Sequence, residues 1–434
     1  MRFLPKHITL SRFWRNALTL ISGSAAAQAV QLIAMPILSR LYPDSEFGVF
    51  GFFLAVISAT LVIINGGYEL AVMLPDKQVQ ARRLVQASLW ICLTLVILTS
   101  ALLWGFGATW MDMAQMSRLS PFLWMIPLGL LLEGLAQPLR VGLNRVGRYK
   151  TLASANLLRV VTMSAYSVGM GYLEPTFQHL MWGWLIGIGC SFGLIAWDYL
   201  RLPDMNWKPL PWADLWDTMR GYLDFPTYGI LSAWLNTAAK MMPLYVLSAF
   251  FSESVNGQYS QMAKVMNLPI ALIALSIGGV FYEHASKAYQ TDPKGLSSIS
   301  MKTLGRLALI GLPYLGIVMA IGPWMFSLVL GPQWELAGEY ARIMAPSFYL
   351  TFLVAPMSFL IDIRRKLHAW LWLNVTSFGL RFGALWLAHE WGWDDRSTLM
   401  LFSGTGVVVG IIQLAYLGWI SQVTGADLEM NAED

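Results

Sequence analysis

Four basic side chains lie inside long apolar stretches, where a charge is costly and therefore informative. They are Arg159, Lys240, Lys264 and Arg381. A Lys or Arg near the middle of a bilayer costs at least about 2.5 kcal/mol, and a functional role is the default interpretation. For Lys264 the alternative is that its ammonium group reaches the membrane surface, and for Arg159 the alternative is a structural ion pair. Cations gathered in such a region attract the anionic groups of a substrate.

Uncharged polar residues recur at helical spacing in the same stretches. One stripe runs at steps of four through Tyr228, Ser232, Asn236 and Lys240. Others include Gln28 with Gln31, and Glu133, Gln137, Arg140 and Asn144. A polar face turned toward lipid leaves its groups unpaired, so these faces should look into a cavity or onto a neighbouring helix. For the Ser and Thr members, hydrogen bonding between helices explains the pattern as well.

Three carboxylates, Glu69, Asp224 and Asp362, lie near the ends of the apolar stretches. They leave coupling to protons or sodium ions open. The two cysteines, Cys92 and Cys190, lie inside predicted spans, and the five histidines lack ligand spacing. We therefore expect no disulfide, no metal and no cofactor.

The elements that must position these residues are transmembrane helices. The 434 residues are 56% hydrophobic and only 12% charged, with a mean hydropathy of +0.54. Runs of about 20 apolar residues, the length that crosses a bilayer, recur along almost the whole chain. The predicted spans are 16 to 38, 47 to 68, 84 to 107, 119 to 139, 152 to 172, 178 to 198, 221 to 248, 257 to 282, 303 to 322, 341 to 361, 367 to 389 and 397 to 420. The sequence therefore predicts an all-α integral membrane protein of about twelve helices.

The twelve helices divide into two equivalent lobes. A shift of 209 residues lays SRLYPDSEFGVF, from Ser39, over SAFFSESVNGQY, from Ser248, without a gap. Both segments follow the first helix of a six-helix half, which predicts lobes related by a pseudo-twofold axis along the membrane normal. We predict an N-lobe over residues 1–200, a cytoplasmic interlobe loop over 201–220 that lies on the membrane surface, and a C-lobe over 221–434 that ends in an acidic cytoplasmic tail.

The basic residues outside the spans sort by side of the membrane. The amino terminus and alternate loops hold 21 of the 29, whereas the opposite loops hold only Arg40, Arg118, Arg342 and Arg396. By the positive-inside rule both termini are cytoplasmic. No GxxxxGK loop occurs, so hydrolysis of ATP by this chain is not expected.

Several segments, in this order, resemble the Wzx-type polysaccharide flippases of the multidrug/oligosaccharidyl-lipid/polysaccharide (MOP) exporter superfamily. They are PILSRLYPDSEFGVF from Pro36, GGYELAVMLP from Gly66, LNRVGRYKTLA from Leu143, YLDFPTYG from Tyr222, GQYSQMAKVMNLP from Gly257 and GGVFYEHAS ending at Ser286. The resemblance covers most of the chain. Two positions differ from the family pattern. Gly67 stands where a basic residue is frequent, and Lys264 stands where an Arg is frequent, which keeps the charge without the bidentate fork.

The resemblance implies a MOP/MATE-like fold and a multi-pass protein of the bacterial inner membrane. It implies export of an undecaprenyl-diphosphate-linked oligosaccharide, such as an O-antigen repeat unit, to the periplasmic leaflet. Its expected partners are membrane lipids, a glycan polymerase and a chain-length regulator, with no nucleic acid. Because no bond is made or broken, we expect no enzyme activity.

On this hypothesis a cationic central cavity captures the diphosphate while alternating access moves the substrate across the membrane. The residues expected to meet the diphosphate are Lys240, Lys264, Arg381, Arg159 and Arg40. Those expected to meet sugar are Gln28, Gln31, Asn236 and Tyr228.

Two other functions remain as alternatives. A multidrug or organic-cation antiporter of the same superfamily would favour an acidic cavity, whereas the deep charges here are basic. A membrane glycan polymerase or ligase would need a sizeable loop for catalysis, and the longest loop is residues 199–220.

The predicted orientation can be tested by thiol labelling. An impermeant reagent applied from the periplasm should modify single cysteines placed at Asp112, Glu335 or Asp394. Reaction only after permeabilisation is expected for cysteines at Arg148, Lys294 or Arg365. The reverse pattern would overturn the orientation.

Overall fold

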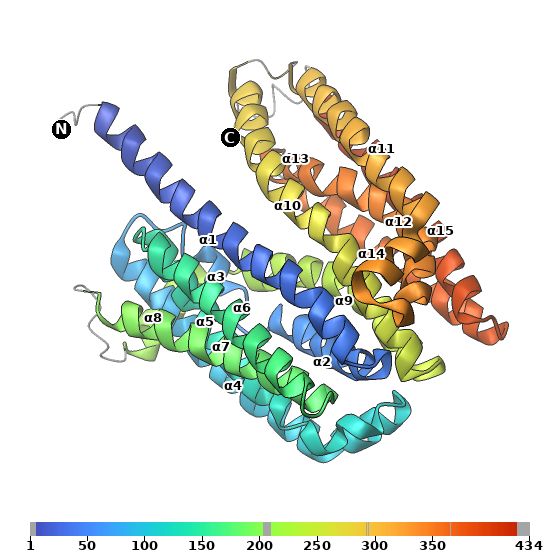
Figure 1. The fold of residues 1–434 in the computed structure, drawn as a ribbon. Helices are drawn as coiled ribbons and strands as arrows, with labels where there is room; N and C mark the ends of the chain where they lie inside the picture. Colours follow the sequence, from blue (N-terminus) through green and yellow to red (C-terminus); the bar gives the residue numbers. More distant parts are fainter. Residues whose placement is uncertain (1–5, 203–209, 292, 294, 365, 423–434) are drawn as a thin grey trace. The chain divides into compact units, whose positions relative to one another are not determined.

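A computed structural model describes residues 6–202, 210–291, 293, 295–364 and 366–422. The described part is helical and contains no strand. Twelve long helices occupy the twelve predicted spans, which confirms the predicted fold class (Figure 1). They are α1 (Lys6–Leu41), α2 (Asp44–Leu61), α4 (Gln78–Met113), α5 (Met125–Arg145), α6 (Tyr149–Gly171), α7 (Phe177–Leu200), α9 (Ile230–Phe250), α10 (Glu253–Thr291), α11 (Gly295–Leu330), α12 (Glu335–Met357), α14 (Leu367–Glu390) and α15 (Asp395–Ser421). The shorter elements are α3 (Tyr68–Ala71), α8 (Trp212–Arg220), α13 (Phe359–Ile363) and three short non-α segments, η1 (Ser117–Phe122), η2 (Phe225–Gly229) and η3 (Pro332–Trp334).

The chain forms two compact units. Unit 1 consists of Met1–Thr237 with Ser252–Ser254, and unit 2 consists of Ala238–Phe251 with Val255–Asp434. The division between units falls inside α9, and the predicted lobe boundaries stay a prediction.

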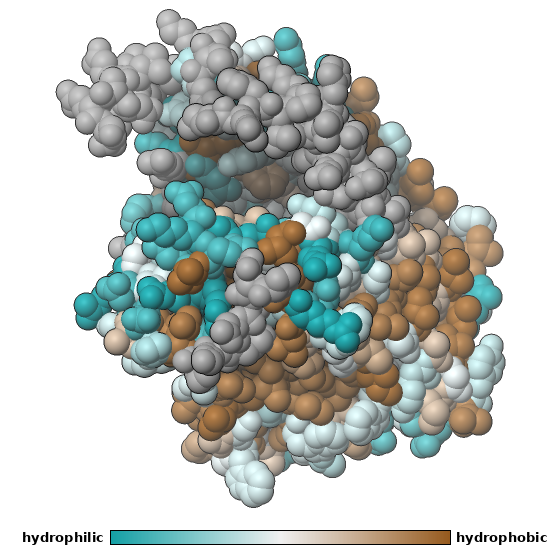
Figure 2. Space-filling view, turned by 90° about the vertical axis from the view of Figure 1, so that its left-hand side faces the viewer, coloured by the Kyte–Doolittle hydropathy of each residue, from teal (hydrophilic) through white to brown (hydrophobic). Residues whose placement is uncertain are grey.

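Much of the surface is apolar, as lipid requires. Among the described residues, six helical segments are long and apolar enough to cross a membrane by length and composition. In two of them, Gln78–Met113 and Gly295–Leu330, only 11% and 17% of the most apolar window is buried inside the protein. In Figure 2, which looks onto the side of the molecule that carries α8 in Figure 1, hydrophilic residues gather in one area and hydrophobic residues cover much of the surface around it. This pattern is typical of a protein with water at its ends and lipid around its sides.

The turns that follow α1 and α9 support the internal repeat. The helix ends at Leu41 and Phe250 differ by 209 residues, as do the next helix starts at Asp44 and Glu253. An acidic residue in the first turn of α2 and of α10 stabilises the positive end of the helix dipole. The shift found in the sequence therefore coincides with equivalent helix boundaries.

The second span is shorter than predicted. Helix α2 ends at Leu61, and Gly66 and Gly67 adopt φ of +65° and +71°, a left-handed conformation that a side chain disfavours. Within this break Asn65 is fully buried and donates through its amide nitrogen to Gln137 at 2.7 Å. Irregular backbone near membrane depth is tolerated because protein surrounds it. Helix α10, by contrast, continues without interruption from Glu253 to Thr291.

The seventh predicted span, 221 to 248, also begins differently. Residues Phe225–Gly229 form a π-type turn that contains Pro226, and the regular helix starts at Ile230. Proline removes one backbone donor and disfavours an unbroken helix through this point. Before it, α8 holds exposed Trp212 and Trp216, as expected for a segment on the membrane surface. Trp207, from the same predicted loop, lies outside the described residues.

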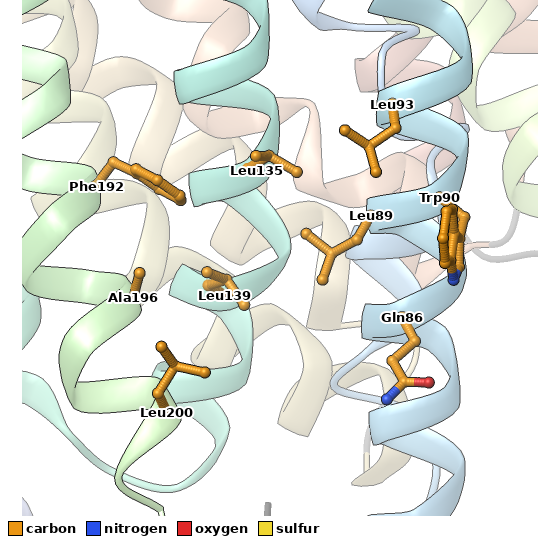
Figure 3. Close-up of a pocket in the computed structure, with 9 residues that line it drawn as sticks. All are labelled: Gln86, Leu89, Trp90, Leu93, Leu135, Leu139, Phe192, Ala196 and Leu200. Atoms are coloured by element: carbon orange, nitrogen blue, oxygen red, sulfur yellow. The ribbon is translucent and has the colours of Figure 1, made fainter. Parts of the chain in front are cut away.

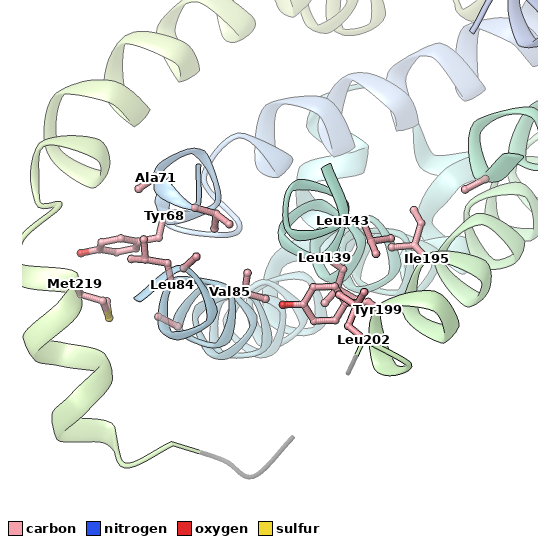
Figure 4. Close-up of a cluster of buried hydrophobic side chains, with 14 residues drawn as sticks. Tyr68, Ala71, Leu84, Val85, Leu139, Leu143, Ile195, Tyr199, Leu202 and Met219 are labelled. Carbon is pink, nitrogen blue, oxygen red and sulfur yellow. The ribbon is translucent and has the colours of Figure 1, made fainter. Parts of the chain in front are cut away.

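A cluster of buried side chains holds one end of unit 1 together (Figure 4). It joins Tyr68 of α3, Leu84 of α4, Leu143 of α5, Tyr199 of α7 and Met219 of α8. These five side chains are at most 5% exposed. The packing fixes the C-terminal half of α5 against α4 and α7, and this part of α5 carries polar residues of the candidate site.

Helices α6 and α7 pack side by side at very short range (Figure 1). A Cβ added to Gly187 would lie 2.7 Å from the carbonyl oxygen of Arg159. Small residues permit this close approach, which is a common basis of helix association in lipid. The backbone position of Arg159 is thereby fixed by its neighbour.

Candidate functional site

A polar cavity of about 350 Å³ lies within unit 1. Helix α5 contributes Arg140 and Asn144, which are four residues apart and share a face, and α6 contributes Asn156 and Arg159, three residues apart. Ser24 of α1 and Ser191 of α7 also line it. Two guanidinium groups and two amides thus converge on a space large enough for a small polar ligand.

Glu133 organises the basic side of this cavity. Arg159 donates through Nη1 to both carboxylate oxygens of Glu133 at 3.1 Å, and Arg140 donates to Oε1 at 3.3 and 3.4 Å. The Glu133 side chain is 9% exposed. One carboxylate beneath two guanidinium groups leaves one formal positive charge in excess. Arg159 therefore makes the ion pair that was its alternative interpretation and also lines the cavity.

Two further predicted cations come together in unit 2. Lys240 of α9 and Arg381 of α14 are close enough to interact electrostatically, and Tyr259 of α10 interacts with Arg381. The Arg381 guanidinium lies 5.6 Å from the centre of the Phe402 ring, and its buried Nε has no hydrogen-bond partner among the described residues. Within the described part of the chain, neither cation forms a hydrogen bond or an ion pair. Two like charges at short range repel each other, so this pair is suited to an anion.

The other residues predicted for the site differ in burial. Gln28 is half-buried, with Oε1 unpartnered in the described structure, whereas Gln31 and Asn236 are exposed. Arg40 lies exposed in the last turn of α1, and Lys264 is half-buried on α10. The side chain of Tyr228 lies outside the described residues.

The three predicted coupling carboxylates differ in burial. Glu69 of α3 is 9% exposed, and its Oε2 atom is buried without a hydrogen-bond partner among the described residues. It lies four residues after Asn65, beside the break that follows α2. Asp224 and Asp362 are exposed. Because an unpaired buried carboxylate favours protonation or a bound cation, Glu69 is the carboxylate best suited to ion coupling.

Three contributors were not predicted from the sequence. Asn156 and Ser191 line the unit 1 cavity, and Tyr259 accompanies Arg381. Asn156 shares a helical face with Arg159 three residues later, so the helical spacing could have predicted that Asn156 lies beside Arg159. Nothing in the sequence places Ser191 or Tyr259 beside their partners, because those contacts join separate helices.

A second cavity of unit 1, about 460 Å³, has the opposite character (Figure 3). Leu89, Leu135 and Phe192, with other apolar residues, form its lining between α4, α5 and α7. Its one polar residue, Gln86, accepts a hydrogen bond from the backbone of Leu210 at 3.1 Å. The lining suits hydrocarbon and offers nothing to a charged head group.

Comparison with known proteins places the chain by family and by fold. Residues 37–338 match the family described as polysaccharide biosynthesis protein. No curated protein sequence matches. Among solved structures, similarity extends to an inward-facing multidrug resistance MATE family transporter of the MOP superfamily, with a TM-score of 0.69 and 12% identity over 92% of this chain and 96% of that one.

Two further structures share the fold. The lipid II flippase MurJ, in an inward closed conformation, has a TM-score of 0.69 and 10% identity over 92% of this chain and 87% of that one. A MOP superfamily transporter from Pyrococcus furiosus, described by the reverse polarity of its binding pocket, has a TM-score of 0.64 and 14% identity over 95% of this chain and 96% of that one. These similarities confirm the MOP fold.

The ion pair of Glu133 with Arg159 can be tested through stability. E133Q leaves two guanidinium groups without their carboxylate and should destabilise the protein by about 3 kcal/mol. Adding R159M should recover part of that loss, because a neutral pair avoids the unpaired charge. Thermal unfolding in detergent measures the stability of E133Q, R159M and the double variant E133Q/R159M. The control is E335Q, at an exposed position of α12. Strictly additive effects of E133Q and R159M would contradict the coupling.

Proposed function

The chain belongs to the polysaccharide biosynthesis protein family, and from this premise we propose that it is a flippase for a lipid-linked glycan. Its substrate is an undecaprenyl-diphosphate-linked oligosaccharide of the O-antigen repeat-unit type. The chain moves this molecule from the cytoplasmic to the periplasmic leaflet of the bacterial inner membrane by alternating access. The reaction makes and breaks no bond, so the protein is a transporter without enzyme activity, cofactor or metal.

The observation that carries this proposal is the pair of cations Lys240 and Arg381. Lys240 is exposed and Arg381 is half-buried, and charges within membrane spans that lack a counter-ion are expensive and mark a ligand site or pathway. A diphosphate supplies the missing negative charge, and the planar guanidinium of Arg381 matches phosphate oxygens bidentately. In this proposal Lys264 and Arg40 add positive potential along the path.

The unit 1 cavity is suited to the sugar part of the substrate. Its amide and hydroxyl groups, from Asn144, Asn156, Ser24 and Ser191, both donate and accept hydrogen bonds, as sugar hydroxyl groups require. Gln28, Gln31, Asn236 and Tyr228 are proposed to extend these contacts. The apolar polyprenyl tail stays in the lipid.

A multidrug antiporter with this fold is less consistent with the charges. A cationic drug needs a free carboxylate in its site, whereas Glu133 at the unit 1 cavity is already engaged by Arg140 and Arg159. Glu69, whose Oε2 atom has no hydrogen-bond partner among the described residues, does not line this cavity. Among the structures with this fold, MurJ is described as a lipid II flippase, and the Pyrococcus furiosus transporter is described by a binding pocket of reverse polarity. A basic site on this fold thus favours an anionic lipid-linked substrate.

The assigned roles of Lys240 and Arg381 can be tested by substitution. K240A and R381A should each reduce surface glycan at least tenfold, because the diphosphate loses a partner. K240R should retain part of the activity, since it keeps the charge. Immunoblotting of the glycan, with membrane levels of each variant, measures the effect, and K150A at an exposed lysine is the matched control. Normal glycan display by both K240A and R381A at normal expression would refute the roles.

The driving force is a separate question with its own experiment. Moving a negative head group outward from a negative interior is favoured by about 2.3 kcal/mol per charge per 100 mV. In proteoliposomes, a potassium-valinomycin potential without a pH or sodium gradient should therefore accelerate outward translocation, and reversing its sign should slow it. If translocation does not respond to the potential but is restored by a proton or sodium gradient, the membrane potential is not the driving force. Loss of this gradient-driven translocation in E69Q would then assign the coupling to Glu69. D224N and D362N test the two exposed carboxylates in the same assay.

A further inference from the structure

A cavity of about 390 Å³ in unit 2 is separate from every residue assigned to the substrate. It lies between one face of α10 and one face of α11, whose lining positions follow helical spacing. Phe281 and Leu307, at 3% and 0% exposure, form its buried floor. Val280 and Ile310 line it and are 59% and 50% exposed, so its apolar side opens to the surroundings of the protein.

The cavity is amphipathic along the helix axes. Helix α10 runs toward its connection with α11, and α11 runs away from it, so His284, Lys302 and Arg306 lie nearer that connection than Val280 and Ile310 do. One helical turn, about 6 Å, separates His284 from Val280 and Arg306 from Ile310. The space therefore has a basic end and an apolar end, in the order that a lipid head group and chain would follow.

The charge at the basic end is not neutralised by the described part of the protein. Lys302 and Arg306 are exposed and form no hydrogen bond or ion pair with another described residue. The neighbouring carboxylate, Glu283, interacts with His284 and pairs with Lys287 at 2.6 Å. Among the described residues, no carboxylate lines the cavity. An anion is thus the complementary ligand for this end.

We propose that this cavity binds an anionic glycerophospholipid. Its phosphate lies between Lys302 and Arg306, whose Cβ atoms at positions i and i+4 are about 6 Å apart, a spacing that suits a single phosphate. One acyl chain follows Val280 and Ile310 over the floor of Phe281 and Leu307. The orientation predicted from the basic loops places this end in the cytoplasmic leaflet, where anionic lipids interact with basic pockets between helices. The inference does not depend on which lipid-linked molecule the chain transports.

Native mass spectrometry of the full chain in a neutral detergent tests the proposal. Phosphatidylglycerol should remain bound at one molecule per chain, at least fivefold more than phosphatidylcholine with the same acyl chains. K302Q/R306Q should lower the retained phosphatidylglycerol at least fivefold, and the charge-preserving K302R/R306K should retain it. The matched control, K77Q/K150Q, removes two exposed lysines elsewhere and should change retention less than twofold.

Size-exclusion profiles and helical content establish that each variant is folded. Equal retention of the two phospholipids, or an equal loss in K77Q/K150Q, would overturn the proposal because binding would then be non-specific. Displacement by inorganic phosphate at the same concentration would show that the acyl chain contributes nothing and would also overturn it. Preferential retention of undecaprenyl phosphate over phosphatidylglycerol would refute the assignment to a glycerophospholipid and transfer the site to the transport substrate.

Discussion

The requirement that a charge inside a membrane protein has a partner governs the interior of this molecule. In unit 1 the requirement is met within the protein, because Glu133 holds Arg159 and Arg140 and the three side chains connect α5 with α6. In unit 2 Lys240 and Arg381 have no such carboxylate within the described chain. The first arrangement fixes the side of the unit 1 cavity formed by α5 and α6 and leaves one positive charge in excess. The second leaves a charge that only a ligand or water can satisfy.

The sequence predicted the helices well because lipid leaves few alternatives. Every backbone group in the hydrocarbon must be bonded internally, so long apolar stretches become helices. The depth of Lys240 and Arg381 marked them as a pair of interest, and the structure places them close together. Their role in binding stays a proposal. The break after Leu61 was not predicted. Apolar residues continue through it, so hydropathy does not change where the backbone does, although Gly66 and Gly67 lie there.

Contacts between helices could not be read from the sequence. The partner of Arg159 lies 26 residues earlier on another helix, and helical spacing relates only residues on the same helix. The polar face of Glu133, Gln137, Arg140 and Asn144 was recognisable, yet Gln137 contacts Asn65 whereas Glu133 contacts Arg159. Fold similarity does not separate the candidate functions either, since a MATE transporter and MurJ both have a TM-score of 0.69. The character of the site depends on individual side chains.

The interruption after α2 makes the two segments related by the shift of 209 residues structurally unequal. Helix α10 keeps a helical conformation over 39 residues, about 58 Å at 1.5 Å per residue, although Pro269 in its interior removes one backbone hydrogen bond. The corresponding segment of the first half is interrupted, because α2 ends at Leu61 and Gly66 and Gly67 adopt positive φ. A change of direction there needs only rotation about glycine backbone dihedrals, whereas a change of direction within α10 requires a regular helix to bend.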